Sequence, residues 1–364
     1  MPAKLPLDPT AGVMYNQSRT SEFSKLAKLG SEARSTATSV LSRAIVRRLE
    51  SASVDAEARK VLSFTDNRQD ASLQAGHFND FNQVIRLRSA IYQAARNAPD
   101  QILESDRLAR SVFDALDVPE KVYARNPIDA SGFSVSENKN RKALKKMIFY
   151  RALDDLRRSW RIVLPNLEQC ALLEIGYEEL EDIAAQNAGW AAVDAFADLH
   201  ADTRLALLTD ILNYFRTSYA LEHVDLEAAN IDSNTNLIRN RLTPRWGLDS
   251  DEEIQTPKYA YVQSFQRRGV PSSSIGYASA LGKHLRRHDA LEDRLSDRDD
   301  YHRFMEDLLG ILTQLGYLSR TEKDYQGESI PLYRLQVDRL LWKAPNEDRT
   351  IEPYRDDVRM QAKK

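Results

Sequence analysis

The sequence predicts a mostly α-helical fold with one partial α/β segment near its amino-terminal end. Three observations lead to this prediction. Apolar residues recur at steps of three and four over much of the chain, which is the spacing of helices that bury one face. A short apolar run at 61–64 has the character of a buried strand. Near the carboxyl-terminal end, two strand-like runs flank a polar turn and follow a helical pattern.

Composition limits the kinds of site to consider. The chain has 364 residues, enough for two or three domains. Its net charge of −3 gives no overall basic field, so any nucleic-acid contact must be a local patch. The single cysteine, Cys170, excludes an intramolecular disulfide and a thiolate metal cluster, and its apolar neighbours predict a core position. Without a run of about 18 apolar residues, we expect a cytoplasmic protein with no membrane contact.

Residues 1–98 are predicted to form a helix–strand–helix portion of an α/β lobe. The expected elements are a helix at 32–50, a strand at 60–65 and a helix at about 67–97. The first helix repeats apolar residues every four positions, at Ala37, Leu41, Ile45 and Leu49. A single strand cannot form a sheet, so other chain segments must complete this lobe.

The most informative phrase lies at 60–81, where the apolar strand runs into Phe-Thr-Asp-Asn-Arg-Gln-Asp-Ala. A second phrase at 29–38, Leu-Gly-Ser-Glu-Ala-Arg-Ser-Thr-Ala-Thr, precedes it. In this order the two phrases resemble the start of the second RecA-like lobe in a branch of bacterial DEAD/DEAH-box helicases of superfamily 2, around helicase motif IV. The resemblance covers roughly residues 20–95, about a quarter of the chain.

The resemblance implies that the turn after this strand faces nucleic acid or the cleft between two lobes. Arg68 would pair with a phosphate there, and Asn67 or Gln69 would bond to sugar or phosphate oxygens. The alternative is a structural turn in which Arg68 pairs with Asp70 or another acid.

Arg34, Ser35 and Thr36 are candidate phosphate contacts. They fall in the first helical turns after Gly30, where free backbone amides and hydroxyls suit an anion. The alternative is ordinary helix capping.

The nucleotide-binding motif of a helicase does not occur in this sequence. The phosphate-binding loop reads Gly-x-x-x-x-Gly-Lys-Ser/Thr, and the nearest imitation, at 276–284, has one residue too many between its glycines. We therefore expect no catalytic residue, no bound cofactor and no ATPase activity in this chain alone. A complete helicase would bind ATP and magnesium in a first lobe, supplied in cis or in trans.

Residues 99–257 are predicted to form a helical insertion. Apolar periodicity predicts helices at 142–164, 175–187, 190–199 and 203–220. Polar, turn-rich sequence predicts a loop at 126–141 and a linker at 230–257.

A basic cluster lies where the predicted loop meets the predicted helix. Its members are Arg141, Lys142, Lys145 and Lys146, with Lys139 beside them, and no acidic residue occurs from 138 to 153. Each contact with a phosphate would release counterions and make binding salt-dependent. The alternative is a solvated helix face.

Residues 258–345 are predicted to form a winged-helix module, followed by a polar tail at 346–364. The expected elements are helices at 258–268, from about 271 to 287 and at 300–315, then strands at 317–320 and 332–335. Gly316 marks the end of the third helix. His284 and His288 lie one helical turn apart, but without a third ligand nearby we predict no metal site.

The favoured interpretation is a segment of an ATP-dependent DNA helicase or translocase that contributes nucleic-acid contact and coupling. Two other classes remain open. One is a non-enzymatic winged-helix protein that binds DNA or regulates, and the other is a helical scaffold for protein interactions.

Overall fold

The computed structural model describes most of the chain between residues 38 and 345, together with two short strands near the amino terminus. The described residues are 7–8, 13–14, 38–52, 54–61, 83–127, 135–157, 166–263, 270–325 and 327–345. They belong to two compact units, one comprising Met1–Ser89 with Asn346–Lys364 and the other comprising Ala90–Pro345. Each unit is described by itself.

The first unit contains a helix at 38–51, which matches the described part of the helix predicted at 32–50. The other described elements are the antiparallel pair β1 (Leu7–Asp8) and β2 (Val13–Met14), the 3-10 turn η1 (Ala56–Ala58) and a helix at 83–96 that continues into the second unit. The predicted buried stripe is wrong, since Leu41 and Ile45 are 62% and 47% exposed. The side of this helix that borders a hollow beside the helix at 83–96 carries Ala44 and arginines. The predicted strand lies outside the described residues, apart from Lys60 and Val61.

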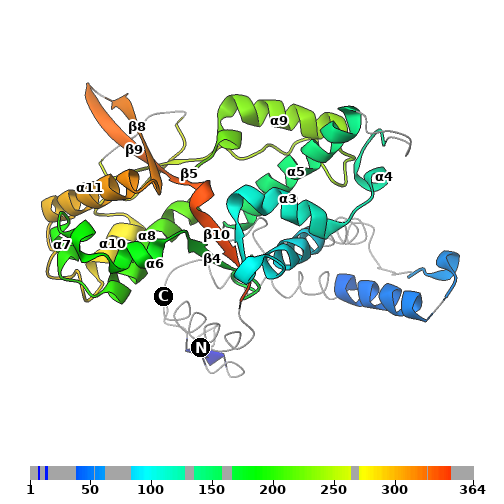
Figure 1. The fold of residues 1–364 in the computed structure, drawn as a ribbon, viewed down its shortest axis with the longest axis horizontal. Helices are drawn as coiled ribbons and strands as arrows, with labels where there is room; N and C mark the ends of the chain where they lie inside the picture. The colour runs from blue at the N-terminus through cyan, green and yellow to red at the C-terminus, as the bar shows by residue number, and fades with distance from the viewer. Residues whose placement is uncertain are drawn as a thin grey trace, which may run out of the picture. The chain divides into compact units, whose positions relative to one another are not determined.

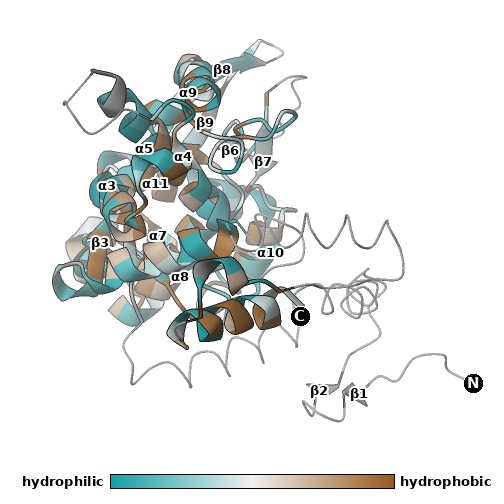
Figure 2. Cartoon of the chain, turned by 90° about the vertical axis from the view of Figure 1, so that its right-hand side faces the viewer, coloured by the Kyte–Doolittle hydropathy of each residue, from teal (hydrophilic) through white to brown (hydrophobic). Residues whose placement is uncertain are grey.

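Helices predominate in the second unit (Figure 1). The α-helices are α3 (Ser105–Leu116), α4 (Glu120–Tyr123), α5 (Val135–Asp155), α6 (Leu180–Ala185), α7 (Asp194–Ala197), α8 (Ala201–Thr217), α9 (Ala228–Arg241), α10 (Ala280–Arg286) and α11 (Arg298–Gln314). Short 3-10 turns are η2 (Pro99–Gln101), η3 (Asn187–Trp190), η4 (Val224–Leu226) and η5 (Val337–Arg339). Hydrophobic and hydrophilic residues share helices such as α8 and α10 (Figure 2), as expected for helices that bury one side.

One small sheet joins the two ends of the second unit. Its order is β3 (Ile102–Glu104), β10 (Leu340–Lys343) and β4 (Glu174–Tyr177), with β10 antiparallel to both neighbours. Trp342 is completely buried. Its Nε1 donates to Ser105 Oγ at 3.0 Å, and that hydroxyl donates to the Leu340 carbonyl at 2.8 Å. The first turn of α3 is thereby attached to the last strand of the unit.

A second, mixed sheet is built around β9. Its strands are β5 (Leu221–Glu222), β6 (Tyr259–Tyr261), β7 (Ser272–Ser274), β8 (Leu318–Tyr325) and β9 (Glu328–Gln336). β9 is antiparallel to β8 and β6 and parallel to β5, and β7 is parallel to β6. Both sheets therefore combine strands from the predicted helical insertion with strands from the predicted carboxyl-terminal module.

Several predicted elements are confirmed among the described residues. The fold is mostly α with strands in mixed sheets, as predicted. α8, α11 and the β8–β9 hairpin lie where periodicity placed them. Gly316 ends α11 with a positive φ of 76°, a conformation that glycine adopts without steric cost.

Other predicted elements are wrong, because strand pairing overrides helical periodicity. The helix predicted from 175 begins as β4, which pairs with β10, and the helix predicted from 258 begins as β6, which pairs with β7 and β9. The phrase at 271–274, read as a helix opening, contains β7.

Three loop and core predictions also fail. α5 begins at Val135, inside the predicted loop at 126–141. α9 occupies much of the predicted linker at 230–257, where Ile231 and Ile238 are buried seven residues apart. Cys170 is exposed, because Leu167 takes the buried position of that turn.

Two helical glycines provide a matched test of packing. A Cβ at Gly282 in α10 would meet the carbonyl oxygen of Gly276 and lie 2.7 Å from that of Tyr277, whereas a Cβ at Gly310 in α11 would meet no atom within 4 Å. We expect Gly282→Ala to lower the free energy of unfolding by about 1–3 kcal/mol through overpacking. Gly310→Ala should raise it by up to about 1 kcal/mol through helix propensity. Urea denaturation of both variants measures this, and equal effects would contradict the packing described.

Candidate nucleic-acid interface

Only part of the predicted interface lies among the described residues. The predicted contacts that fall outside them are Arg34, Ser35, Thr36, Asn67, Arg68 and Gln69. Their roles remain predictions from the resemblance. The basic cluster of α5 is described, and the site is built from it.

α5 is held in place by α3, α4 and α9, which pack against it. Ala143, Leu144 and Met147 turn into the core. Near its start, Asn140 is buried and its Nδ2 donates to Glu120 Oε1 at 2.5 Å and to the Asn126 carbonyl at 3.2 Å. The amino-terminal half of α5 is therefore anchored to α4, and its remaining side faces solvent.

Lys146 is not available to a ligand, because it forms an ion pair within the fold. Its Nζ lies 2.6 Å from Asp225 Oδ1 and 2.5 Å from Oδ2. Asp225 Oδ1 also accepts from Asn234 Nδ2 at 3.3 Å, and the Tyr150 hydroxyl donates to the Asp225 carbonyl at 2.7 Å. Burial raises the pKa of Tyr150 to about 12, so its hydroxyl keeps the proton that it donates.

The other basic residues of the cluster differ in their surroundings. Lys145 is half-buried, with Nζ 5.2 Å from the centre of the Phe113 ring, a cation–π contact. Arg141 and Lys142 are exposed, as is Lys139. The candidate interface is therefore narrower than the sequence predicted and lies on the exposed side of α5 from residue 139 to 142.

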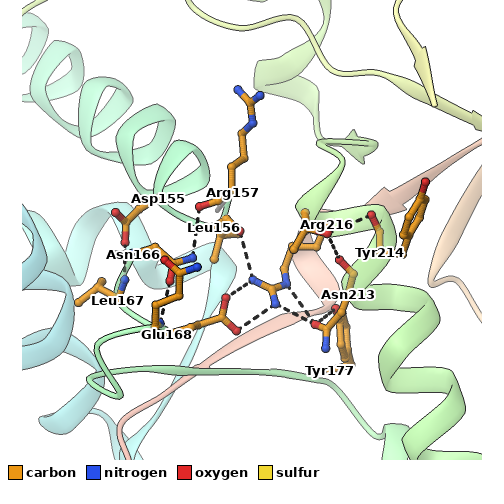
Figure 3. A network of polar contacts seen from close by, with 12 residues as sticks. Asp155, Leu156, Arg157, Asn166, Leu167, Glu168, Tyr177, Asn213, Tyr214 and Arg216 are labelled. Carbon is orange, nitrogen blue, oxygen red and sulfur yellow. Dashed lines mark hydrogen bonds and ion pairs between the residues drawn. The ribbon is translucent and has the colours of Figure 1, made fainter. Parts of the chain in front are cut away.

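A buried polar network lies close to the far end of α5 (Figure 3). Arg216 of α8 is at its centre and forms a two-pronged ion pair with Glu168, at 2.9 Å for Nη2–Oε1 and 2.5 Å for Nη1–Oε2. Its Nη2 also donates to Asn213 Oδ1 at 2.8 Å, and the Tyr177 hydroxyl donates to the same oxygen at 2.9 Å. The network thus joins α8, the turn at 166–170 and β4.

This network is structural rather than a ligand site. The side chain of Arg216 is only 3% exposed. Burial acts to lower the pKa of Arg216, but Tyr177 and the Glu168 carboxylate outweigh it and raise the pKa above its ordinary value. Burial raises the pKa of Tyr177 as well. The Arg216 guanidinium and the Tyr177 hydroxyl therefore keep their protons across the working pH range.

Asp154 of α5 has the most perturbed carboxyl group near this network. Burial raises its pKa from 3.8 to about 6, although Arg151 and Arg157 oppose the shift. Arg151 is itself paired with Glu252 at 2.7 Å for Nη2–Oε2, and Arg157 donates to Gln255 Oε1. The two arginines are therefore shared with other acceptors and do not fully stabilise a charged Asp154.

No metal site is apparent in the described part of the chain, where no three His, Cys, Asp or Glu side chains are grouped to hold an ion. His284 Nε2 lies 2.7 Å from Asp210 Oδ2, and His288 Nδ1 accepts from the Ala290 amide at 3.2 Å. The two histidines are therefore engaged separately. In the same part of the chain, no helix combines the length and apolarity needed to cross a bilayer.

Comparisons with known proteins add no family to this description. Searches against known protein families, curated protein sequences and solved structures found no match. The functional interpretation rests on the sequence and on the geometry above.

Substitution of Lys146 and of Lys142 tests whether the first lysine stabilises the fold and the second is an exposed charge. We expect Lys146→Met to lower the free energy of unfolding by about 1–3 kcal/mol, because it leaves the half-buried Asp225 carboxylate without its cation. Lys142→Met removes an exposed charge and should change it by at most about 0.5 kcal/mol. Chemical denaturation of both variants measures the difference, and a larger loss for Lys142→Met would reverse the assignment.

The raised pKa of Asp154 predicts that its replacement by asparagine stabilises the protein to a degree that depends on pH. Because its pKa is raised in the folded state, the native protein binds this proton more tightly than the unfolded chain. The stability that this proton contributes is fully present below the unfolded-state pKa of 3.8 and is lost as the pH rises through about 6. Asp154→Asn should therefore stabilise the protein by about 1–3 kcal/mol near neutral pH and above.

The gain from Asp154→Asn should vanish at about pH 4, where the wild-type carboxyl is also neutral. Asp155→Asn is the matched control, because Asp155 Oδ2 accepts from the Leu167 amide at 3.1 Å and its replacement should not stabilise. Denaturation curves at both pH values test this. A gain that is independent of pH would rule out the shifted carboxyl as its cause.

Proposed function

We propose that this chain is a segment of a DEAD/DEAH-box helicase of superfamily 2 that contributes nucleic-acid contact and coupling. The phrase at 60–81, preceded by the phrase at 29–38, is the observation that carries the proposal. Residues 1–98 would then open a RecA-like second lobe. A first lobe, in cis or in trans, would bind ATP and magnesium, and the chain alone would not hydrolyse ATP.

The arrangement of the carboxyl-terminal helices and strands supports the proposed winged-helix module. If α8 of the predicted insertion is counted as the first helix, the chain continues through α9 to β6, α10, α11 and the β8–β9 hairpin, and β9 lies between β6 and β8 in antiparallel pairing. A helix, a strand, two helices and a hairpin in this order are typical of winged helices. α9, β5 and β7 would be additions to that plan.

The charge on α11 decides which surface we propose for nucleic acid. In a DNA-binding winged helix this third helix would be the recognition helix. Its exposed positions include Asp299, Glu306 and Asp307, and Arg303 lies 3.7 Å from Asp300. Acids repel phosphates. We therefore place the contact on Arg141 and Lys142 of α5 and on the predicted turn at 67–69, with DNA as the expected partner.

The same acidic face favours a second candidate function. A winged helix whose third helix presents Asp299, Glu306 and Asp307 is suited to a basic protein surface. The chain would then be a helical interaction module without its own enzymatic role. In that case its affinity for DNA would be negligible at physiological salt.

The proposal predicts weak, salt-dependent DNA binding that depends on α5. About three phosphate contacts would give a slope of roughly −2 to −3 in a plot of log affinity against log salt. Arg141→Glu with Lys142→Glu should weaken binding and flatten this slope by roughly 2. The matched control is Lys283→Glu with Arg287→Glu, an exposed basic pair on α10 and at the residue that follows it, which should have the smaller effect.

Fluorescence anisotropy with labelled DNA over a salt series provides the measurement. If the Lys283 and Arg287 substitutions had the larger effect, the DNA contact would be assigned to the proposed winged-helix module instead of α5. Absence of DNA binding would favour the protein-interaction module instead. ATP turnover by the chain alone, abolished by a substitution within it, would contradict the proposed division of labour.

A further inference from the structure

A hollow of about 560 Å³ lies in the first unit between the helix at 38–51 and the helix that begins at 83. Its walls include three arginines and a hydroxyl, Arg43, Arg47, Arg48 and Ser51, and apolar side chains such as Val40 and Ile85. We call it the arginine groove. It lies outside α5 and outside the predicted turn at 67–69.

The three arginines share one side of a single helix. Positions 40, 43, 44, 47, 48 and 51 recur at steps of three and four, which places them along one face. Arg43 and Arg47 are one turn apart, a rise of about 6 Å along the helix. The guanidinium groups therefore form a row rather than a ring around one point.

The positive charge in the groove is not balanced by acids. Among the described residues, no carboxylate forms an ion pair with Arg43, Arg47 or Arg48, and Arg43 Nη1 is buried without a hydrogen-bond partner. Burial lowers the pKa of Arg43, and the charges of Arg47 and Arg86 lower it further. A buried donor without an acceptor and like charges in close proximity both destabilise the fold.

An arrangement that destabilises the folded protein is expected where it serves binding rather than folding. Guanidinium groups donate two parallel hydrogen bonds to phosphate oxygens, which would satisfy Arg43 Nη1 and neutralise the row. The apolar wall at Val40 and Ile85 offers a surface for sugars or bases beside the phosphates.

We propose that the arginine groove binds the sugar–phosphate backbone of a nucleic-acid strand. The row of charges suits successive phosphates along a strand. It suits a magnesium–triphosphate group poorly, because the groove is made by the sides of two helices, whose amides are already bonded within the helix. The choice of ligand rests on the proposed function, whereas the position rests on the groove itself. It adds a nucleic-acid surface to those proposed on α5 and at the turn 67–69.

The decisive comparison uses two pairs of arginine substitutions in the full chain. Arg43→Gln with Arg47→Gln removes two charges from the groove. Arg107→Gln with Arg110→Gln removes two exposed charges from α3 and is the matched control. The readouts are anisotropy of a labelled oligothymidylate over a salt series and thermal unfolding of each variant.

We expect the groove pair to weaken binding on the order of tenfold at about 0.1 M salt and to flatten the salt slope by about 1.4, the loss of two single-strand phosphate contacts. The α3 pair should leave the slope nearly unchanged. The melting temperature of the groove pair should stay the same or rise, because repulsion is relieved. Arg43→Lys with Arg47→Lys keeps the charge and should lose less affinity than the glutamine pair.

The outcomes separate this inference from the proposed function. If the chain binds DNA through Arg141 and Lys142 but the groove pair binds as well as wild type, the inference falls and the proposed function stands. If the chain binds neither DNA nor RNA oligonucleotides, both fall. A marked loss of stability in both groove pairs would assign the arginines a structural role and overturn the inference.

Discussion

The second unit depends on β10, the strand that lies between β3 and β4. It pairs Leu341 with Glu104 on one side and with Gly176 on the other, bringing the two ends of the unit together. A buried hydrogen bond of 3.0 Å between Trp342 and Ser105 stabilises this arrangement of the two ends. In Figure 1, β10 lies in the middle of the unit, between the group of α3, α5 and α9 and the group of α6, α8 and α11. The helices on both sides therefore share one scaffold.

Long-range ion pairs decide which charges are left for function. Lys146 is committed to Asp225, 79 positions along the chain, and Arg216 to Glu168, 48 positions away. The first pair joins α5 to η4, and the second joins α8 to the turn at 166–170. What remains exposed on α5 is the short basic stretch from 139 to 142. The candidate interface is thus the exposed part of the basic cluster.

The proposed function distributes nucleic-acid contact over both units. The first unit offers the arginine groove, where Arg43 and Arg47 form no ion pair with a carboxylate among the described residues. The second offers Arg141 and Lys142 on α5. The acidic third helix of the proposed winged-helix module would then face a protein or another lobe. Such a division suits a coupling segment, in which one surface follows the nucleic acid and another transmits motion.

The sequence by itself determined the mostly α-helical class, the position of α11 and its glycine stop, the β8–β9 hairpin and the basic character of the start of α5. These follow from local periodicity, turn chemistry and charge, which a window of residues contains. Only the tertiary structure decided that residues 174–177 and 259–261 are strands, since each is held by a partner far away in the chain. It also decided that Lys146 is paired and that Arg43 and Arg47 face a hollow. Those outcomes depend on contacts between distant segments, and no local pattern specifies them.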